Sequence, residues 1–176
     1  INSLTFNTLL TGSIGSGTGG SLTITTGNIT KLNITGTETN FTISAPVVLG
    51  ASGAWTVDGS YTLTISGIVS DGGNDHGVTF AGAGALTLAG ANTFNGPIVV
   101  NRSGGTVTIN GLQSGAGDVT VNSGTLSAGA AGRLTDGGNI TVNAGALSIS
   151  GAATTSGNVA IHDGTVTVAA GKTLTD

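Results

Sequence analysis

The 176-residue chain contains no cysteine and no methionine, and only 7% of its residues are charged. Without cysteine it can form no disulfide, and no thiolate is present to act as a nucleophile or to ligate zinc or an iron–sulfur cluster. Four basic residues stand against eight acidic ones, which excludes the basic patch that a nucleic-acid partner requires. No apolar run approaches the about 18 residues of a membrane-spanning helix.

Glycine and short alternating segments are abundant instead. The 33 glycines are scattered through the chain, and each one inside a helix costs about 1 kcal/mol relative to alanine. Apolar residues alternate with threonine and serine over four or five positions, as in residues 21–25, 61–65 and 105–109. This period of two, with β-branched residues, is typical of strands with one buried face. The sequence therefore predicts an all-β fold of many short strands.

Two series of strands repeat together at a spacing of about 21 residues, a period that indicates stacked repeats. The first apolar residues of one series are Leu22, Phe41, Leu63, Leu86, Val107, Leu126, Leu147 and Val166. Those of the second series are Leu32, Trp55, Val78, Ile98, Val119, Ile140 and Val159. A third, less regular apolar element follows at 47–49, 68–69, 112 and 134.

This pattern predicts a parallel β-helix, that is, a β-solenoid with about 21 residues per turn over residues 1–176. One coil alone would have one apolar face and two unpaired backbone edges, and stacking coils satisfies both. About eight coils at about 4.8 Å each would form a rod about 40 Å long. We expect the chain to be one segment of a larger surface protein.

One column of outward residues carries only hydroxyl groups. Its predicted members are Thr23, Thr42, Thr64, Thr87, Thr108, Ser127, Ser148 and Thr167. One interpretation is a solvated sheet in which threonine is chosen for its β-propensity. The other is a face that binds something flat, such as ice or a polysaccharide. The flanking columns are interrupted by alanines such as Ala85 and Ala146, which disfavours ice binding.

Residues 71–77 form the one concentrated polar cluster. Asp71, Asn74 and Asp75 could bind calcium, since hard cations take carboxylate and carbonyl oxygens. A plain loop insertion between coils is the alternative, and the 23-residue gap from Leu63 to Leu86 favours it. No other metal ligand set and no cofactor is expected.

The acidic residues do not form the pair that a glycosidase needs, with carboxylates about 5 to 9.5 Å apart. Asp118 precedes a strand, and Asn139 and Asn158 occupy its place in the next coils, so it is predicted to be a turn residue. Lys31, Arg102, Arg133 and Lys172 are spread over different coils, and no Gly-x-Ser-x-Gly motif occurs. We expect no enzymatic activity, although a polysaccharide-active enzyme fragment stays the least favoured alternative.

Residues 84–101 resemble the passenger-associated transport repeat of bacterial autotransporters, the autotransporter-associated β-strand repeat. The residues in matching places are Leu86, Leu88, Gly90, Asn92, Phe94 and Gly96. Pro97 and Ile98 depart from the Gly-Thr that is common in the family. The resemblance implies a right-handed β-helix in a passenger domain that is exported through a C-terminal outer-membrane β-barrel of the same parent chain. The absence of cysteine is consistent with such export.

These observations predict a non-catalytic structural stalk of a secreted or cell-surface protein, which either holds a distal region away from the cell or offers a long, weakly adhesive surface. The alternative is an adhesin module that binds a glycan or the surface of a host or neighbouring cell. Its site would lie on the hydroxyl column or the 71–77 loop. Self-association, end to end or lateral, is a further expectation.

Overall fold

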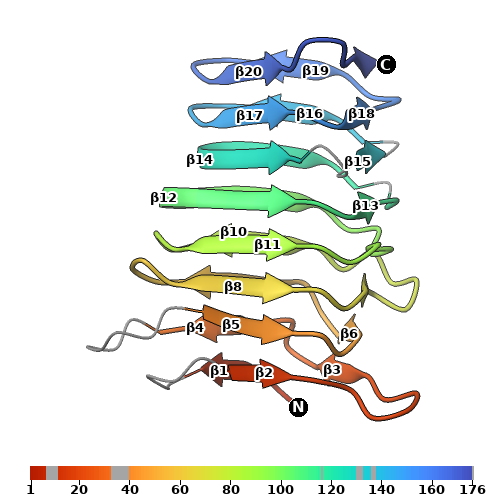
Figure 1. Ribbon diagram of the computed structural model, residues 1–176. Coiled ribbons are helices and arrows are strands. Elements are labelled where there is room, and N and C mark those ends of the chain that lie inside the picture. The colour runs from red at the N-terminus through yellow and green to blue at the C-terminus, as the bar shows by residue number, and fades with distance from the viewer. Residues whose placement is uncertain (7–11, 33–39, 116, 130–132, 136–137, 176) are drawn as a thin grey trace.

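The computed structural model describes residues 1–6, 12–32, 40–115, 117–129, 133–135 and 138–175, and every regular element within these ranges is a β-strand. The strands stack as coils that rise from the N-terminus to the C-terminus (Figure 1), and all strand pairs within the described ranges are parallel. The predicted β-solenoid is confirmed, with about seven turns. The first coil is longer than the others, because Gly12 pairs with Phe41, 29 residues further along the chain.

Each coil has three faces, which we number in chain order. Face 1 consists of β1 (Leu4–Phe6), β4 (Ile29–Lys31), β7 (Gly53–Val57), β10 (Val78–Ala81), the first parts of β12 (Ile98–Ile109) and β14 (Val119–Ala128), β16 (Ile140–Val142) and β19 (Val159–Ile161). Face 2 consists of β2 (Gly12–Ile14), β5 (Asn40–Ile43), β8 (Thr62–Ile65), β11 (Ala85–Leu88), the second parts of β12 and β14, β17 (Ala146–Ile149) and β20 (Thr165–Val168). Face 3 consists of β3 (Leu22–Ile24), β6 (Val47–Leu49), β9 (Val69–Ser70), β13 (Leu112–Gln113), β15 (Arg133–Thr135), β18 (Ala152–Thr154) and β21 (Leu174–Thr175).

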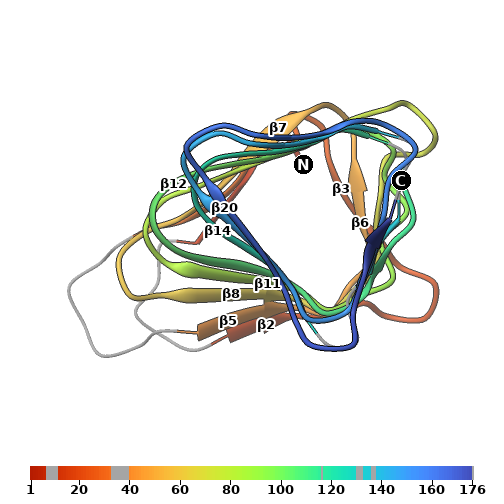
Figure 2. The same cartoon turned by 90° about the horizontal axis from the view of Figure 1, so that it is seen from above.

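The coil is right-handed. Seen along the axis from the C-terminal end (Figure 2), the chain passes counter-clockwise through the faces while it rises toward the viewer. Strands β12 and β14 continue round the corner between faces 1 and 2, so these faces form one 14-stranded sheet. On face 3 the ladder passes from β9 to β13 through Asn92, which makes an isolated parallel bridge to Gln113.

The predicted inward columns are confirmed from Phe41 to Val166 on face 2, where all seven residues of the first series pair in register. On face 1 the series from Val78 to Val159 is likewise in register. Leu63, Leu86, Val107, Leu126 and Leu147 are fully buried. Their burial stabilises the coil by roughly 1.5–3 kcal/mol for each side chain.

Three early members of the series were placed wrongly. Leu22 pairs with Val47 on face 3, not with Phe41, because an alternating triplet is the same on any face and does not reveal which face it occupies. On face 1 it is Ile29, not Leu32, that pairs with Trp55. Trp55 pairs with Phe80, two residues beyond its predicted partner Val78. Both Trp55 and Val57 of β7 point inward, so the alternation alone does not show which inward residue lies in which column.

Candidate functional site

The hydroxyl column exists as an unbroken row on face 2. Thr42, Thr64, Thr87, Thr108, Ser127, Ser148 and Thr167 pair in consecutive coils. The first member is Ser13, which pairs with Thr42, and not Thr23, which pairs with Val48 on face 3. We call these eight residues, Ser13 and Thr42 to Thr167, the hydroxyl column.

The column presents neutral hydrogen-bonding groups at the coil spacing of about 4.8 Å. Each hydroxyl is both a donor and an acceptor. Its central members from Thr42 to Ser148 are half-buried between their neighbours. The flanking column is mixed, since Thr62 pairs with Ala85 and Thr125 with Ala146. This surface can therefore hydrogen-bond a flat polar ligand, but it brings no charge to a reaction.

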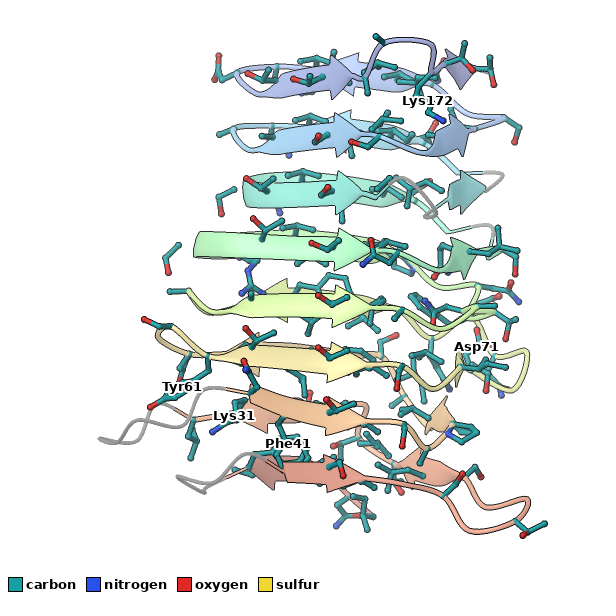
Figure 3. The ribbon with its side chains drawn as sticks, in the orientation of Figure 1. Lys31, Phe41, Tyr61, Asp71 and Lys172 are labelled. Carbon is teal, nitrogen blue, oxygen red and sulfur yellow. The ribbon has the colours of Figure 1, made fainter. Side chains whose placement is uncertain are left out.

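The 71–77 loop projects at the end of face 3, and Asp71 anchors it (Figure 3). The Asp71 side chain is only 2% exposed. Its Oδ1 accepts a hydrogen bond from the Gly73 N–H at 2.9 Å, and its Oδ2 accepts one from the Asn95 N–H in the next coil at 2.9 Å. Burial alone would raise the pKa of the Asp71 carboxyl, but the bonds from Asn95 and Gly73 outweigh it, and the net pKa is lowered.

Of the three calcium candidates, the loop brings two into contact. The Asn74 side-chain N–H donates to the Asp71 carbonyl at 3.0 Å, whereas Asp75 is exposed with φ 55°. Both Asp71 oxygens already accept backbone N–H groups. In the described part of the chain no three His, Asp or Glu side chains are grouped so that they could hold a metal ion. The local geometry is that of a loop fastened to the coil above it.

Asp118 lies where the turn prediction placed it. Its Oδ1 accepts hydrogen bonds from the Asn139 N–H at 2.7 Å and from Asn139 Nδ2 at 3.2 Å. The Asn139 Oδ1 then accepts the Asn158 N–H at 2.9 Å. These side chains join successive coils at one corner. Glu38, Asp136 and Asp176 lie outside the described residues.

Two buried cations were not expected. Lys31 and Arg102 are each 2% exposed and point inward at the corner between faces 1 and 2. The Lys31 ammonium lies 4.5 Å from the centre of the Tyr61 ring, and Figure 3 shows both at this corner. Their parity could have revealed them, since Lys31 is two residues after inward Ile29 and Arg102 two residues after inward Val100.

Arg102 has only neutral hydrogen-bond partners within the described residues. Its Nη2 donates to the carbonyl of Gly84 and its Nε to the carbonyl of Gly104, while Nη1 has no partner there. Burial lowers the pKa of Arg102, although a guanidinium stays charged. The arrangement holds the corner of β12 over the coil below.

Five of the six residues that carry the resemblance in residues 84–101 have a clear structural role. Leu86 and Leu88 fill the core from β11, and Phe94 is fully buried. Asn92 is also fully buried, and its Oδ1 accepts the Val69 N–H at 3.1 Å in place of a backbone carbonyl. A Cβ at Gly96 would lie 2.2 Å from the Gly77 nitrogen, so only glycine fits there.

A shallow hollow of about 250 Å³ lies on face 1 among Ser52, Gly77, Thr79, Pro97 and Val99. None of its lining residues is titratable, so its polar contacts are limited to hydroxyl and backbone groups. No helix suitable for crossing a membrane occurs in the described ranges.

Comparison with protein-family models, with characterised proteins and with solved structures finds no match for this chain.

Proposed function

We propose that this chain is a structural stalk segment of a secreted or cell-surface protein of the autotransporter type, and that it acts without catalysis. The observation that carries the proposal is the continuity of the ladder and the core. Face 2 is paired from Gly12 to Val168, and one hydrophobic cluster extends from Phe6 to Ala153. A rod of stacked coils holds whatever is attached to its ends at a fixed separation.

The surface location and the passenger role rest on the resemblance of residues 84–101 to the autotransporter repeat. An antibody against this chain provides the test on the native source cells. We expect the chain to be digested by a protease added to intact cells, while a cytoplasmic marker is spared. A chain that becomes accessible only after lysis would overturn the surface location.

The stalk role is tested by removing one whole coil from the parent protein. Deletion of residues 107–125 joins Thr106 to Leu126, which is the register partner of Val107. We expect the shortened protein to be displayed at the wild-type level with its distal parts intact. Loss of a specific ligand-binding activity at normal display would show that the segment is more than a spacer.

Glycan binding at the hydroxyl column is a second candidate function, favoured by the in-register row from Ser13 to Thr167. A glycan array with the isolated chain tests it. Binding that is lost in a Thr64→Lys, Thr87→Lys, Thr108→Lys variant would support it. The matched control is Thr120→Lys, Thr141→Lys, since this pair faces outward on face 1. A wild-type chain that binds no glycan on the array would reject it.

A further inference from the structure

We propose that Asn110 is a site of spontaneous covalent modification, at which the side-chain amide is lost and part of the protein acquires isoaspartate in the main chain. The reaction consumes only water and needs no enzyme. It concerns how the rod ages, and it does not depend on the proposed stalk role.

Asn95 and Asn110 are the two asparagines of the chain that are followed by glycine. In such a pair the backbone nitrogen of the glycine can attack the asparagine Cγ, because glycine has no side chain to hinder the approach. The nitrogen loses its proton, Nδ2 leaves as ammonia, and a succinimide ring forms. Water then opens the ring at one of its two carbonyl carbons, which yields aspartate or isoaspartate. The sequence alone therefore predicts two sites, and the fold distinguishes them.

Asn110 and Gly111 lie at the corner between faces 2 and 3, where one arrangement recurs in several coils. The N–H groups of two successive residues donate to the same carbonyl in the coil below, the first at 2.8 Å and the second at 3.2 Å. These pairs are Ser44–Ala45 on Ile14, Ser66–Gly67 on Ile43, Asn110–Gly111 on Leu88 and Ser150–Gly151 on Ala128. Because the second donor shares its acceptor and is the more distant one, the Gly111 nitrogen is held only weakly.

The stacking of coils requires the glycine at this corner but not the asparagine. A Cβ at Gly111 would clash with the carbonyl of Gly90 in the coil below, and a Cβ at Gly90 would clash with the carbonyl of Gly67. Asn110 takes the place that serine has in the other three pairs. Its side chain is exposed, and it is therefore able to rotate toward the Gly111 nitrogen. A reactive amide and an unhindered backbone nitrogen thus coincide here.

Asn95 has the same neighbour in sequence but a different environment. Its N–H donates to the Asp71 carboxylate at 2.9 Å, and Gly96 is buried. A Cβ at Gly96 would clash with the nitrogen of Gly77 in the coil below, and a Cβ at Gly117 in the coil above would clash with the Gly96 carbonyl. The Gly96 backbone is therefore enclosed between two coils, and the ring can form there only after local unfolding.

Isoaspartate at position 110 would disturb the corner. It adds one carbon atom to the main chain between β12, which ends at Ile109, and β13, which begins at Leu112. The two N–H groups could then no longer share the Leu88 carbonyl, and Gly111 would move from its place on Gly90. The aspartate product keeps the main chain unchanged. We therefore expect stability to fall as isoaspartate accumulates.

The experiment is incubation of the folded chain at mildly alkaline pH over several weeks, followed by peptide mapping with mass spectrometry. Replacement of NH₂ by OH raises the mass of the peptide that contains the site, and chromatography separates the isoaspartate and aspartate forms. We expect Asn110 to react at least about tenfold faster than Asn95, because the reaction at Asn95 requires local unfolding. Equal rates at the two sites, or no reaction at Asn110, would overturn the proposal.

The same incubation in guanidinium chloride measures the reactivity of the sequence without the fold. Both pairs are accessible in the unfolded chain, so Asn95 and Asn110 should react at similar rates. If the two rates differ as much in the unfolded chain as in the folded one, neighbouring residues and not the corner cause the selectivity, and the structural assignment is wrong.

Variants connect the modification to the loss of stability. Asn110→Ser introduces the residue found at this place in other coils, and it should fold normally and keep its melting temperature throughout the incubation. The matched control is Asn101→Ser, since Asn101 is exposed but precedes Arg102, and this variant should age as the wild type does. An Asn110→Ser chain whose melting temperature falls as fast as that of the wild type would contradict the role of this site. A wild-type chain that accumulates isoaspartate at position 110 without melting earlier would contradict the disturbance of the corner.

Discussion

Trp55 and Phe80 occupy the same core column in neighbouring coils, with ring centroids 5.9 Å apart and ring planes inclined at 68°. All six aromatic residues lie within the first 94 positions, and all are buried: Phe6, Phe41, Trp55, Tyr61, Phe80 and Phe94. The coils differ in length: Phe80 follows Trp55 by 25 residues, whereas Ile161 follows Val142 by 19. Longer coils thus enclose the aromatic part of the core and shorter ones the aliphatic part.

Trp55 is the residue whose truncation should be most damaging. It is fully buried, and its Nε1 donates to the Gly27 carbonyl at 2.9 Å. We expect Trp55→Ala to lower the free energy of unfolding by about 3–5 kcal/mol, and Trp55→Phe to lower it by less, because the ring is kept. Urea unfolding followed by far-UV circular dichroism measures both. Equal effects of the two variants would show that ring packing is not what stabilises this column.

Adjacent residues of β11 test the assignment of inward and outward sides. Leu86 is fully buried, whereas Thr87 belongs to the hydroxyl column. We expect Leu86→Asp to unfold the coil locally, because an unpaired charge would enter the core. Thr87→Asp should retain most of the wild-type stability. Melting temperatures compare them, and a Leu86→Asp variant that melts at the wild-type temperature would show that the two sides are reversed.

Alanine substitution at two glycines near the corners of the coil should have opposite effects on stability. A Cβ at Gly111 would lie 1.9 Å from the Gly90 carbonyl oxygen, whereas a Cβ at Gly104 would meet nothing within 4 Å. Gly111→Ala should therefore destabilise the fold, since backbone would have to move. Gly104→Ala should leave the free energy of unfolding unchanged or raise it by about 0.4–1 kcal/mol, because alanine reduces the conformational entropy of the unfolded chain. The two melting temperatures decide this, and a Gly111→Ala variant as stable as Gly104→Ala would contradict the close stacking of coils.

Arg102 should be replaceable by an apolar side chain of similar length. Its charge is buried against neutral carbonyls, and replacing a buried ion by a well-packed apolar residue is often stabilising. We expect Arg102→Met to raise the free energy of unfolding by about 1 kcal/mol. Arg102→Ala should lower it, because a cavity remains. If Arg102→Met is as destabilising as Arg102→Ala, the hydrogen bonds to Gly84 and Gly104 outweigh the desolvation of the charge.

Much of the fold is predictable from the sequence because the period of two and the period near 21 residues are independent signals that agree. The register from Val78 onward follows from them, since these coils have nearly constant length. The start of the chain does not, because the irregular first coil between Gly12 and Phe41 breaks the period, and Leu22 then aligns with the wrong face. The hydroxyl column could be foreseen apart from its first member.

The hydrogen-bonding roles of polar side chains were harder to foresee. Asp118 was recognised because Asn139 and Asn158 mark its place in later coils. The Asp71 carboxylate accepts one hydrogen bond from Gly73, two residues away, and another from Asn95 in the next coil. Only the three-dimensional stacking brings the Asn95 N–H to its carboxylate. The sequence favours a loop insertion over a ligand cluster, but it does not reveal that Asp71 fastens this loop to the next coil.

The Asp71 carboxylate should make the stability of the protein depend on pH in the acid range. Its pKa is lowered in the folded state, below the about 3.9 of an unfolded aspartate. Its stabilisation is therefore fully present above about pH 4 and is lost as the pH falls through the lower, folded-state pKa.

In Asp71→Asn one oxygen can still accept an N–H, but the amide NH₂ would face the other N–H donor. We expect this variant to lose about 1–3 kcal/mol at pH 7, and its deficit relative to the wild type to shrink toward pH 2. Thermal unfolding at pH 7, 4, 3 and 2 measures the difference. Asp75→Asn, exposed in the same loop, serves as the control and should follow the wild type. A deficit of Asp71→Asn that stays constant from pH 7 to pH 2 would show that the charge of Asp71 contributes nothing to fastening the loop.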